Sequence, residues 1–242
     1  YAVGKGNVSD NKLTITGGSV DGSLYGGFTA DGTASGNEIT LSAGTVDRVI
    51  GGYAENGEAY GNKINFAGGK VTGDVILNAV GTGSVKGSTF EITDKAEVGG
   101  TVYSAYVSKD GSAENNKLTI SGGNIGGATA GYTNKGNASG NVLTIDGGKV
   151  SGNAVAGMTV EGNAFDNTAI LNGGEVADLY AALTGKGDAS NNTVTLNGGK
   201  ADNVYGGYTN SGNAIGNTVN WYGGDITGGL YGGISEKDGI SA

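Results

Sequence analysis

The sequence predicts an all-β protein, a right-handed parallel β-helix of about nine coils with three short strands in each coil. Three observations predict this fold: a period of 25 or 26 residues, a two-residue alternation of apolar and polar side chains, and recurrent glycine at the bends. A fixed period in this range is typical of solenoids, whose repeats pack only against their neighbours. Parallel crossovers are expected to wind right-handed. One such domain accounts for residues 1–242, and we expect it to be a fragment of a longer array.

The period is marked by one residue that recurs along the chain. It is asparagine at eight positions and Ser88 at a ninth. We expect the asparagine amides to form a ladder of hydrogen bonds along the coils and to satisfy backbone groups at a bend. A residue repeated in every coil fits this structural role better than a row of ligands. The asparagines are Asn11, Asn37, Asn62, Asn116, Asn141, Asn167, Asn192 and Asn217.

Each coil begins, at the marker, with a segment in which polar and apolar residues alternate. It reads NKLTI in residues 11–15 and NTVNW in residues 217–221. A period of two places alternate side chains on opposite faces of a strand, one buried and one solvated. A second segment follows a glycine pair or its equivalent and supplies one inward apolar residue. These inward residues are Val20, Val46, Val71, Ile125, Val150, Val176, Ala201 and Ile226.

The third segment of each coil is represented by LYGGF in residues 24–28. Alternation predicts that Leu24, Gly26 and Phe28 face inward and that Tyr25 faces outward. The equivalent outward position is tyrosine in five coils and Ile50, Ile76, Thr129 or Val155 in the others. The predicted tyrosine row consists of Tyr25, Tyr103, Tyr180, Tyr205 and Tyr231.

Two interpretations of this tyrosine row are open. An exposed aromatic row is a candidate stripe for stacking sugars or for self-association. Alternatively, the tyrosines only stabilise the sheet through contacts between neighbouring strands. Because a shift of one residue would move all of them into the core, the assignment depends on the strand register.

The residue before each marker is glycine, asparagine or aspartate in every coil. These residue types tolerate positive φ, so we expect a left-handed residue at one bend of every coil. The positions are Asp10, Gly36, Gly61, Gly87, Asn115, Gly140, Asp166, Asn191 and Gly216.

One coil departs from the pattern, in residues 76–102. The marker is replaced by Ser88, and the glycine pair is replaced by Asp94 and Lys95. Such an irregularity is either a local binding feature or sequence drift, and drift is the more common cause.

The composition excludes several functions. The chain has no Cys and no His, which removes disulfides, thiolate metal sites and triads that need histidine. A net charge of −9, with Arg48 as the one arginine, argues against nucleic acid as a partner. No apolar run approaches the roughly 20 residues of a membrane-spanning helix. The glycine-rich segments lack a phosphate-binding context and the calcium-binding nonapeptide, so we expect no cofactor and no metal.

The repeat resembles those in the passenger regions of Gram-negative autotransporter adhesins, which use type V secretion. The passages that carry the resemblance are YGGYTNSGNAIGNTV (205–219), AGYTNKGNASGNVLTIDGGKV (130–150) and YGGFTADGTASGNEITLSAGTV (25–46). The resemblance implies a β-helical passenger at the bacterial cell surface or outside the cell, anchored in the outer membrane through a region outside this sequence. It also implies adhesion to a host or bacterial receptor, to a glycan or to itself. The family has no fixed catalytic residues to transfer to this chain.

The leading functional hypothesis is therefore a non-catalytic surface protein, an adhesin or a stalk, with no membrane insertion by this part of the chain. A second hypothesis is a β-helix that binds or cleaves carbohydrate. Paired carboxylates about 5 to 9 Å apart would be needed for cleavage, and the candidates are Asp47 with Asp21 or Asp74, and Asp178 with Asp202. Arg48 lies beside Asp47. A third hypothesis is a fibre or coat subunit that assembles through stacked or lateral β-contacts.

Overall fold

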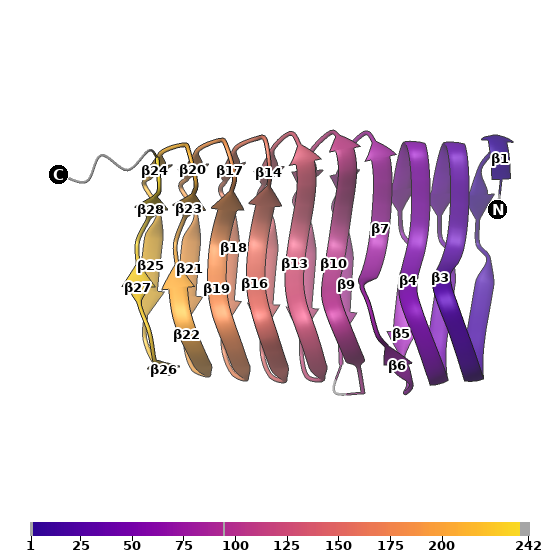
Figure 1. Cartoon of the computed structure of the whole chain (residues 1–242), viewed down its shortest axis with the longest axis horizontal. Coiled ribbons are helices and arrows are strands. Elements are labelled where there is room, and N and C mark those ends of the chain that lie inside the picture. Colours follow the sequence, from indigo (N-terminus) through magenta and orange to yellow (C-terminus); the bar gives the residue numbers. More distant parts are fainter. Residues whose placement is uncertain (1, 94, 238–242) are drawn as a thin grey trace.

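The computed structural model describes residues 2–93 and 95–237. Within these residues the protein is all-β and contains no helix. Its parallel strands stack into a solenoid of about nine turns, with three sheets around each turn. In Figure 1 the strands on the nearer side run upward, and the chain returns downward on the farther side while it advances from right to left. The winding is therefore right-handed, and the fold predicted from the sequence is confirmed.

Most of the nearer side in Figure 1 belongs to one sheet of sixteen strands, here called the long sheet. Its strands are β1 (Ala2–Lys5), β2 (Val8–Ser9), β3 (Lys12–Ser35), β4 (Glu38–Tyr60), β5 (Lys63–Phe66), β6 (Lys70–Val71), β7 (Val75–Thr82), β10 (Glu97–Asp110), β13 (Asn124–Lys135), β16 (Lys149–Thr159), β19 (Glu175–Thr184), β22 (Lys200–Tyr205), β23 (Tyr208–Thr209), β26 (Asp225–Ile226), β27 (Leu230–Tyr231) and β28 (Ile234–Ser235). In the first coils β3 and β4 continue through the bends, so the ladder there follows the chain around the coil.

Two sheets of six strands complete the later coils. The marker sheet follows the marker residue and contains β9 (Thr89–Ile92), β12 (Lys117–Ile120), β15 (Val142–Ile145), β18 (Thr168–Leu171), β21 (Thr193–Leu196) and β25 (Thr218–Trp221). The alanine sheet precedes the bend and contains β8 (Val85–Lys86), β11 (Ala113–Glu114), β14 (Ala138–Ser139), β17 (Ala164–Phe165), β20 (Ala189–Ser190) and β24 (Ala214–Ile215).

The division of the coil into strands differs from the prediction in one respect. In most coils the second and third predicted segments join into one strand, as in β13, which contains both Ile125 and Ala128. They stay separate in β6 and β7 and in β26 and β27. The third sheet is instead the alanine sheet, which the sequence did not reveal. Its strands are two residues long, too short for an alternation to be recognised. Each places one residue inside the coil, such as the buried Ala138, and only in β24 is that residue half-buried.

The core runs the length of the solenoid as columns of like residues. In the marker sheet Leu118 lies beside Leu143, and Ile120 lies beside Ile145, all fully buried. Each such side chain contributes roughly 1.5–3 kcal/mol by leaving water. Because the columns cross the coils, no coil buries its own apolar face, and its stability depends on its neighbours.

The bend before the marker has a left-handed residue in every coil, as predicted. The four non-glycine residues have φ between 55° and 59°, and the five glycines have φ between 62° and 66°. The prediction of positive φ is therefore confirmed at all nine positions.

The in-out assignment predicted for the third segment is correct for Tyr25 but wrong for Phe28. A Cβ on Gly26 would point at the buried Ile39, and a Cβ on Gly27 would meet Nδ2 of the buried Asn37 at 2.5 Å. Two successive residues therefore face inward. The alternation changes phase at the glycine pair, and Phe28 faces outward beside Tyr25, with ring centroids 5.4 Å apart.

Candidate binding face

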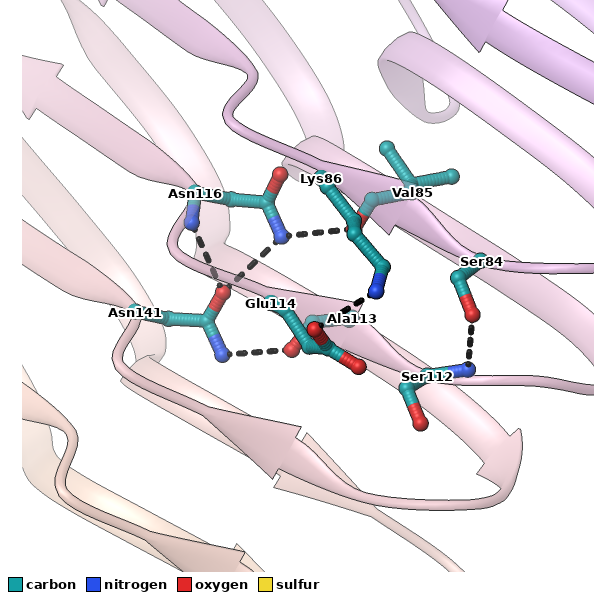
Figure 2. A network of polar contacts seen from close by, with 8 residues as sticks. All are labelled: Ser84, Val85, Lys86, Ser112, Ala113, Glu114, Asn116 and Asn141. Carbon is teal, nitrogen blue, oxygen red and sulfur yellow. Dashed lines mark hydrogen bonds and ion pairs between the residues drawn. The ribbon is translucent and has the colours of Figure 1, made fainter.

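The marker asparagines form a buried ladder between coils. Nδ2 of Asn116 donates to Oδ1 of Asn141 (2.9 Å), and the backbone N–H of Asn116 donates to the same oxygen (3.0 Å). Nδ2 of Asn116 also donates to the carbonyl of Val85 in the preceding coil, as Figure 2 shows. The same pattern joins Asn37 to Asn62 and Asn167 to Asn192. The amides thus satisfy backbone groups that the bend leaves without a ladder partner.

The irregular coil keeps this ladder by an exchange of two residues. Ser88 replaces the marker asparagine, and Asn78 stands at a position occupied by Gly52 in the preceding coil. Asn62 donates to Oδ1 of Asn78 (2.7 Å), and Asn78 donates to Oγ of Ser88 (2.7 Å). The ladder resumes when the N–H of Ser88 donates to Asn116.

This exchange explains Ser88, which the sequence left open between drift and function. Ser88 is smaller than the asparagine of other coils, and Asn78, which is larger than the equivalent Gly52, fills the space that this leaves. Asn78 was not identified from the sequence, because its relation to Ser88 is spatial. Of the two residues that replace the glycine pair in this coil, Asp94 lies outside the described residues, and Lys95 is exposed in a turn.

The outer surface of the long sheet carries two columns of side chains, here called the outer aromatic face. The first column is Tyr25, Ile50, Ile76, Tyr103, Thr129, Val155, Tyr180, Tyr205 and Tyr231. The second is Phe28, Tyr53, Ala79, Tyr106, Tyr132, Met158, Leu183, Tyr208 and Ile234.

The five predicted tyrosines lie on this face with different exposures. Tyr25 and Tyr231 are 37% and 40% exposed, Tyr103 and Tyr205 are half-buried, and Tyr180 is only 8% exposed. The four residues of the first column that are not tyrosine, three of them aliphatic and the fourth Thr129, are at most 3% exposed. The predicted row is therefore only part of a wider aromatic surface.

The second column contains five aromatic residues that the in-out prediction had placed inside. They are Phe28, Tyr53, Tyr106, Tyr132 and Tyr208. The signal that would have found them is the pair of small residues in YGGF and YSAY, since two adjacent small residues leave room for both to face inward. An aromatic residue after such a pair then returns to the outside.

The rings of the face are ordered into stacks along the solenoid. Tyr180, Tyr205 and Tyr231 stack with centroid separations of 4.4 and 5.1 Å. Tyr106 stacks on Tyr132 at 4.7 Å, and rings of different columns meet edge to face, as Tyr208 does with Tyr205. Each such pair contributes about 0.5–1.5 kcal/mol beyond its buried area. The rings therefore stabilise the sheet and also present ordered apolar surface to solvent.

Three tyrosines of the face, Tyr53, Tyr103 and Tyr208, keep their protons to high pH. Burial, followed by the nearby charge of Asp74, raises the pKa of Tyr103 to about 12. Burial and a hydrogen bond to Glu55 raise the pKa of Tyr53 to about 12. For Tyr208 a hydrogen bond to Glu236 is the main cause, and burial the second, of a pKa raised to about 12. The hydroxyls are therefore neutral hydrogen-bond donors over the physiological range.

Four of the five acidic residues considered for glycoside hydrolysis pair with groups other than a second carboxylate. Oδ2 of Asp74 lies 3.6 Å from a guanidinium nitrogen of Arg48, and Oδ1 of Asp74 accepts the N–H of Thr101. Asp178 accepts from Nδ2 of Asn203, its neighbour on the next strand. Of the other three, Asp47 accepts a hydrogen bond from the hydroxyl of Thr72, Asp202 accepts one from the hydroxyl of Thr227, and Asp21 is exposed. Asp178 and Asp202 thus do not occupy paired positions.

Two features are absent from residues 2–93 and 95–237. These residues contain no group of three or more acidic, histidine or cysteine side chains arranged to hold a metal ion. They also contain no helix of the length and apolarity needed to cross a bilayer.

Comparison of the chain with protein families, with curated protein sequences and with solved structures gave no match. The function of the chain is therefore inferred from its residues and from the geometry of the outer aromatic face.

Proposed function

We propose that the chain is a non-catalytic β-helical rod of a bacterial cell surface that adheres through its outer aromatic face. The single observation that carries this proposal is the ordered, partly exposed double column of rings. Monomeric soluble proteins rarely expose large contiguous apolar patches, and such patches mark interaction sites. Aromatic rings are also enriched at interfaces, because they supply large contact areas at low conformational cost. The partners are a surface receptor, a glycan or a second copy of the chain.

The location at the cell surface is supported by the resemblance of the repeats to autotransporter passenger regions. A cysteine-free chain suits export to an oxidising compartment. The repeated coil also suits a stalk, because coils can be added without altering those already present.

The proposal is tested with a variant in which Tyr25, Tyr205 and Tyr231 are changed to threonine. These residues lie on the face, and threonine suits a strand. A matched control changes Tyr60 and Tyr222 to threonine. These two tyrosines are 51% and 76% exposed and lie outside the two columns of the outer aromatic face. Sedimentation across concentration would measure self-association, and a glycan panel and whole cells would measure adhesion.

We expect the control to behave as the wild-type protein and the face variant to lose binding. Unchanged binding by the face variant would show that this surface is not the binding site. If the wild-type protein binds nothing in any of these assays, the proposed role is reduced from an adhesin to a spacer.

A further inference from the structure

The second column of the outer aromatic face has one small residue among large ones, Ala79. Its neighbours along the column are Tyr53 in the preceding coil and Tyr106 in the following one. The ring stacks of the column end on either side of it, with Phe28 on Tyr53 at 5.2 Å and Tyr106 on Tyr132 at 4.7 Å. The place between Tyr53 and Tyr106 therefore holds a methyl group where the adjacent coils hold rings.

A hollow of about 300 Å³ lies over this gap. Ile50, Ile76 and Ala79 form its floor and are at most 3% exposed, because the tyrosine rings pack against them. Tyr25, Phe28 and Tyr53 line one side, and Tyr106 lines the other. A hollow of this volume is at the lower end of the range for small-molecule sites. It suits a single ring held against aromatic walls.

The rim of the hollow is polar and nearly balanced in charge. Arg48 lies on the rim and is paired with Asp74, 3.6 Å away. Glu55 also lies on the rim, where it accepts the hydroxyl of Tyr53 and pairs with Lys109. Since both charged groups are already paired within the protein, the hollow favours a neutral ligand with hydroxyl groups.

One rim group still lacks a partner. Among the described residues, the buried side-chain polar atoms without a hydrogen bond are Nε of Arg48 and Oγ of Ser104. Buried donors are nearly always satisfied, so the unpaired Nε–H of a residue that lines the hollow calls for an acceptor. The Arg48 side chain as a whole is 36% exposed, so a shift of its guanidinium toward the hollow would bring this N–H to a ligand oxygen at the rim. This donor is an argument for a ligand that does not depend on the aromatic walls.

We propose that this hollow binds one neutral pyranose ring of a glycan. A pyranose presents C–H groups on its two faces and hydroxyls around its edge, which matches aromatic walls below a rim of donors and acceptors. An aromatic side chain from a second copy would also stack, but it has no ring of hydroxyl oxygens for Arg48 to meet. The inference rests on the proposed function, in that it names the ligand class for one part of the same face.

The test uses saturation-transfer NMR with a panel of methyl pyranosides of the gluco, galacto, manno and N-acetylgluco series. Ala79→Phe fills the gap with a ring, and Arg48→Lys keeps a cation beside Asp74 but removes Nε. Ala177→Phe is the matched control, at a half-buried alanine away from the outer aromatic face. Circular dichroism verifies that each variant is folded. We expect wild type and Ala177→Phe to bind at least one pyranoside, with transfer to its C–H protons, and both other variants to bind at least tenfold more weakly.

The contrary outcomes are distinguishable. If a pyranoside binds wild type and Ala79→Phe equally, the hollow is not its site, while adhesion through the rest of the face survives. If no pyranoside binds but wild type self-associates and Ala79→Phe does not, the occupant is a ring of a second copy and the pyranose inference is wrong. If wild type binds no pyranoside, no cell and no second copy, both this inference and the proposed function fail.

Discussion

At the residue scale, each coil depends on one left-handed residue before the marker. Asparagine and aspartate occupy this position as well as glycine, because their short polar side chains tolerate positive φ. An ordinary L-residue with a Cβ would pay about 1–2 kcal/mol there. The sequence predicted all nine positions, because only glycine, asparagine and aspartate occur there and these residue types tolerate positive φ.

Gly87 isolates this conformational cost from steric contacts. It has φ of 64°, and a Cβ built there would meet no atom within 4 Å. We expect Gly87→Ala to lower the free energy of unfolding by about 1–2 kcal/mol, measured by urea denaturation. Gly87→Asn is the matched control and should cost much less, since asparagine occupies the equivalent Asn115 and Asn191. Equal losses for both substitutions would contradict the assignment.

The exchange between Asn78 and Ser88 gives a second prediction. Asn78→Gly leaves Asn62 and Ser88 without their partner, and Ser88→Asn brings a second amide into the space of Asn78. Each single change should cost about 1–3 kcal/mol through lost hydrogen bonds or overpacking. The double variant restores the pairing of neighbouring coils and should recover at least half of the summed loss. A double-mutant cycle measures this coupling, and additive losses would show that the two residues act independently.

At the element scale, the long sheet combines a buried face with an ordered aromatic one. The inward columns follow from alternation alone, and the sequence identified them. The outward second column did not follow, because the glycine pair places two successive residues inside the coil and reverses the phase. The alanine sheet was missed for a different reason, since two residues carry no periodicity. Thus the predicted tyrosines do face outward, but they form only one of the two columns of the outer aromatic face.

The aromatic face predicts a distinctive alkaline titration. Tyr53, Tyr103 and Tyr208 have pKa values raised to about 12, against about 10 in an unfolded chain. Between pH 10 and 12 the unfolded chain loses these protons while the folded chain retains them, so stability is complete below pH 10 and falls as pH rises toward 12. Absorbance of tyrosinate should show several of the 12 tyrosines titrating late. Tyr53→Phe should remove one late step, and the same titration in urea should be uniform near pH 10. Uniform titration of the folded protein would contradict the packing of these rings.

At the scale of the whole molecule, the coil is the unit of structure. Val142 lies beside Thr168 on the next strand, and this register continues through the marker sheet. Because each coil packs on its neighbours and nothing else, the stability of the solenoid is close to a sum over coils and their interfaces. The period was visible in the sequence because every coil repeats the same bends. The hollow over Ala79 was not visible there, because it depends on which side chains of neighbouring coils lie side by side.

The repeat predicts that a whole coil can be removed. Deleting residues 142–167 joins Asn141 to Thr168 and keeps every column in phase. The protein should retain its circular dichroism spectrum and become shorter by about 4.8 Å, one strand spacing, as measured by X-ray scattering. Deleting residues 142–154 removes about half a coil and is the control, because it turns the apolar columns outward and should prevent folding. Similar behaviour of the two deletions would contradict the coil as the structural unit.

The hydrogen bonds between coils have a mechanical consequence. The backbone bonds of the sheets and the asparagine ladder both join one coil to the next, so they lie along the axis of the rod. A pull on the two ends acts along these bonds, and tension passes through the coils in series. The terminal coil, held on one side only, detaches first and releases roughly 80 Å of extended chain, from about 25 residues at about 3.3 Å each. Under load a rod of this kind lengthens one coil at a time, and its remaining coils keep their shape.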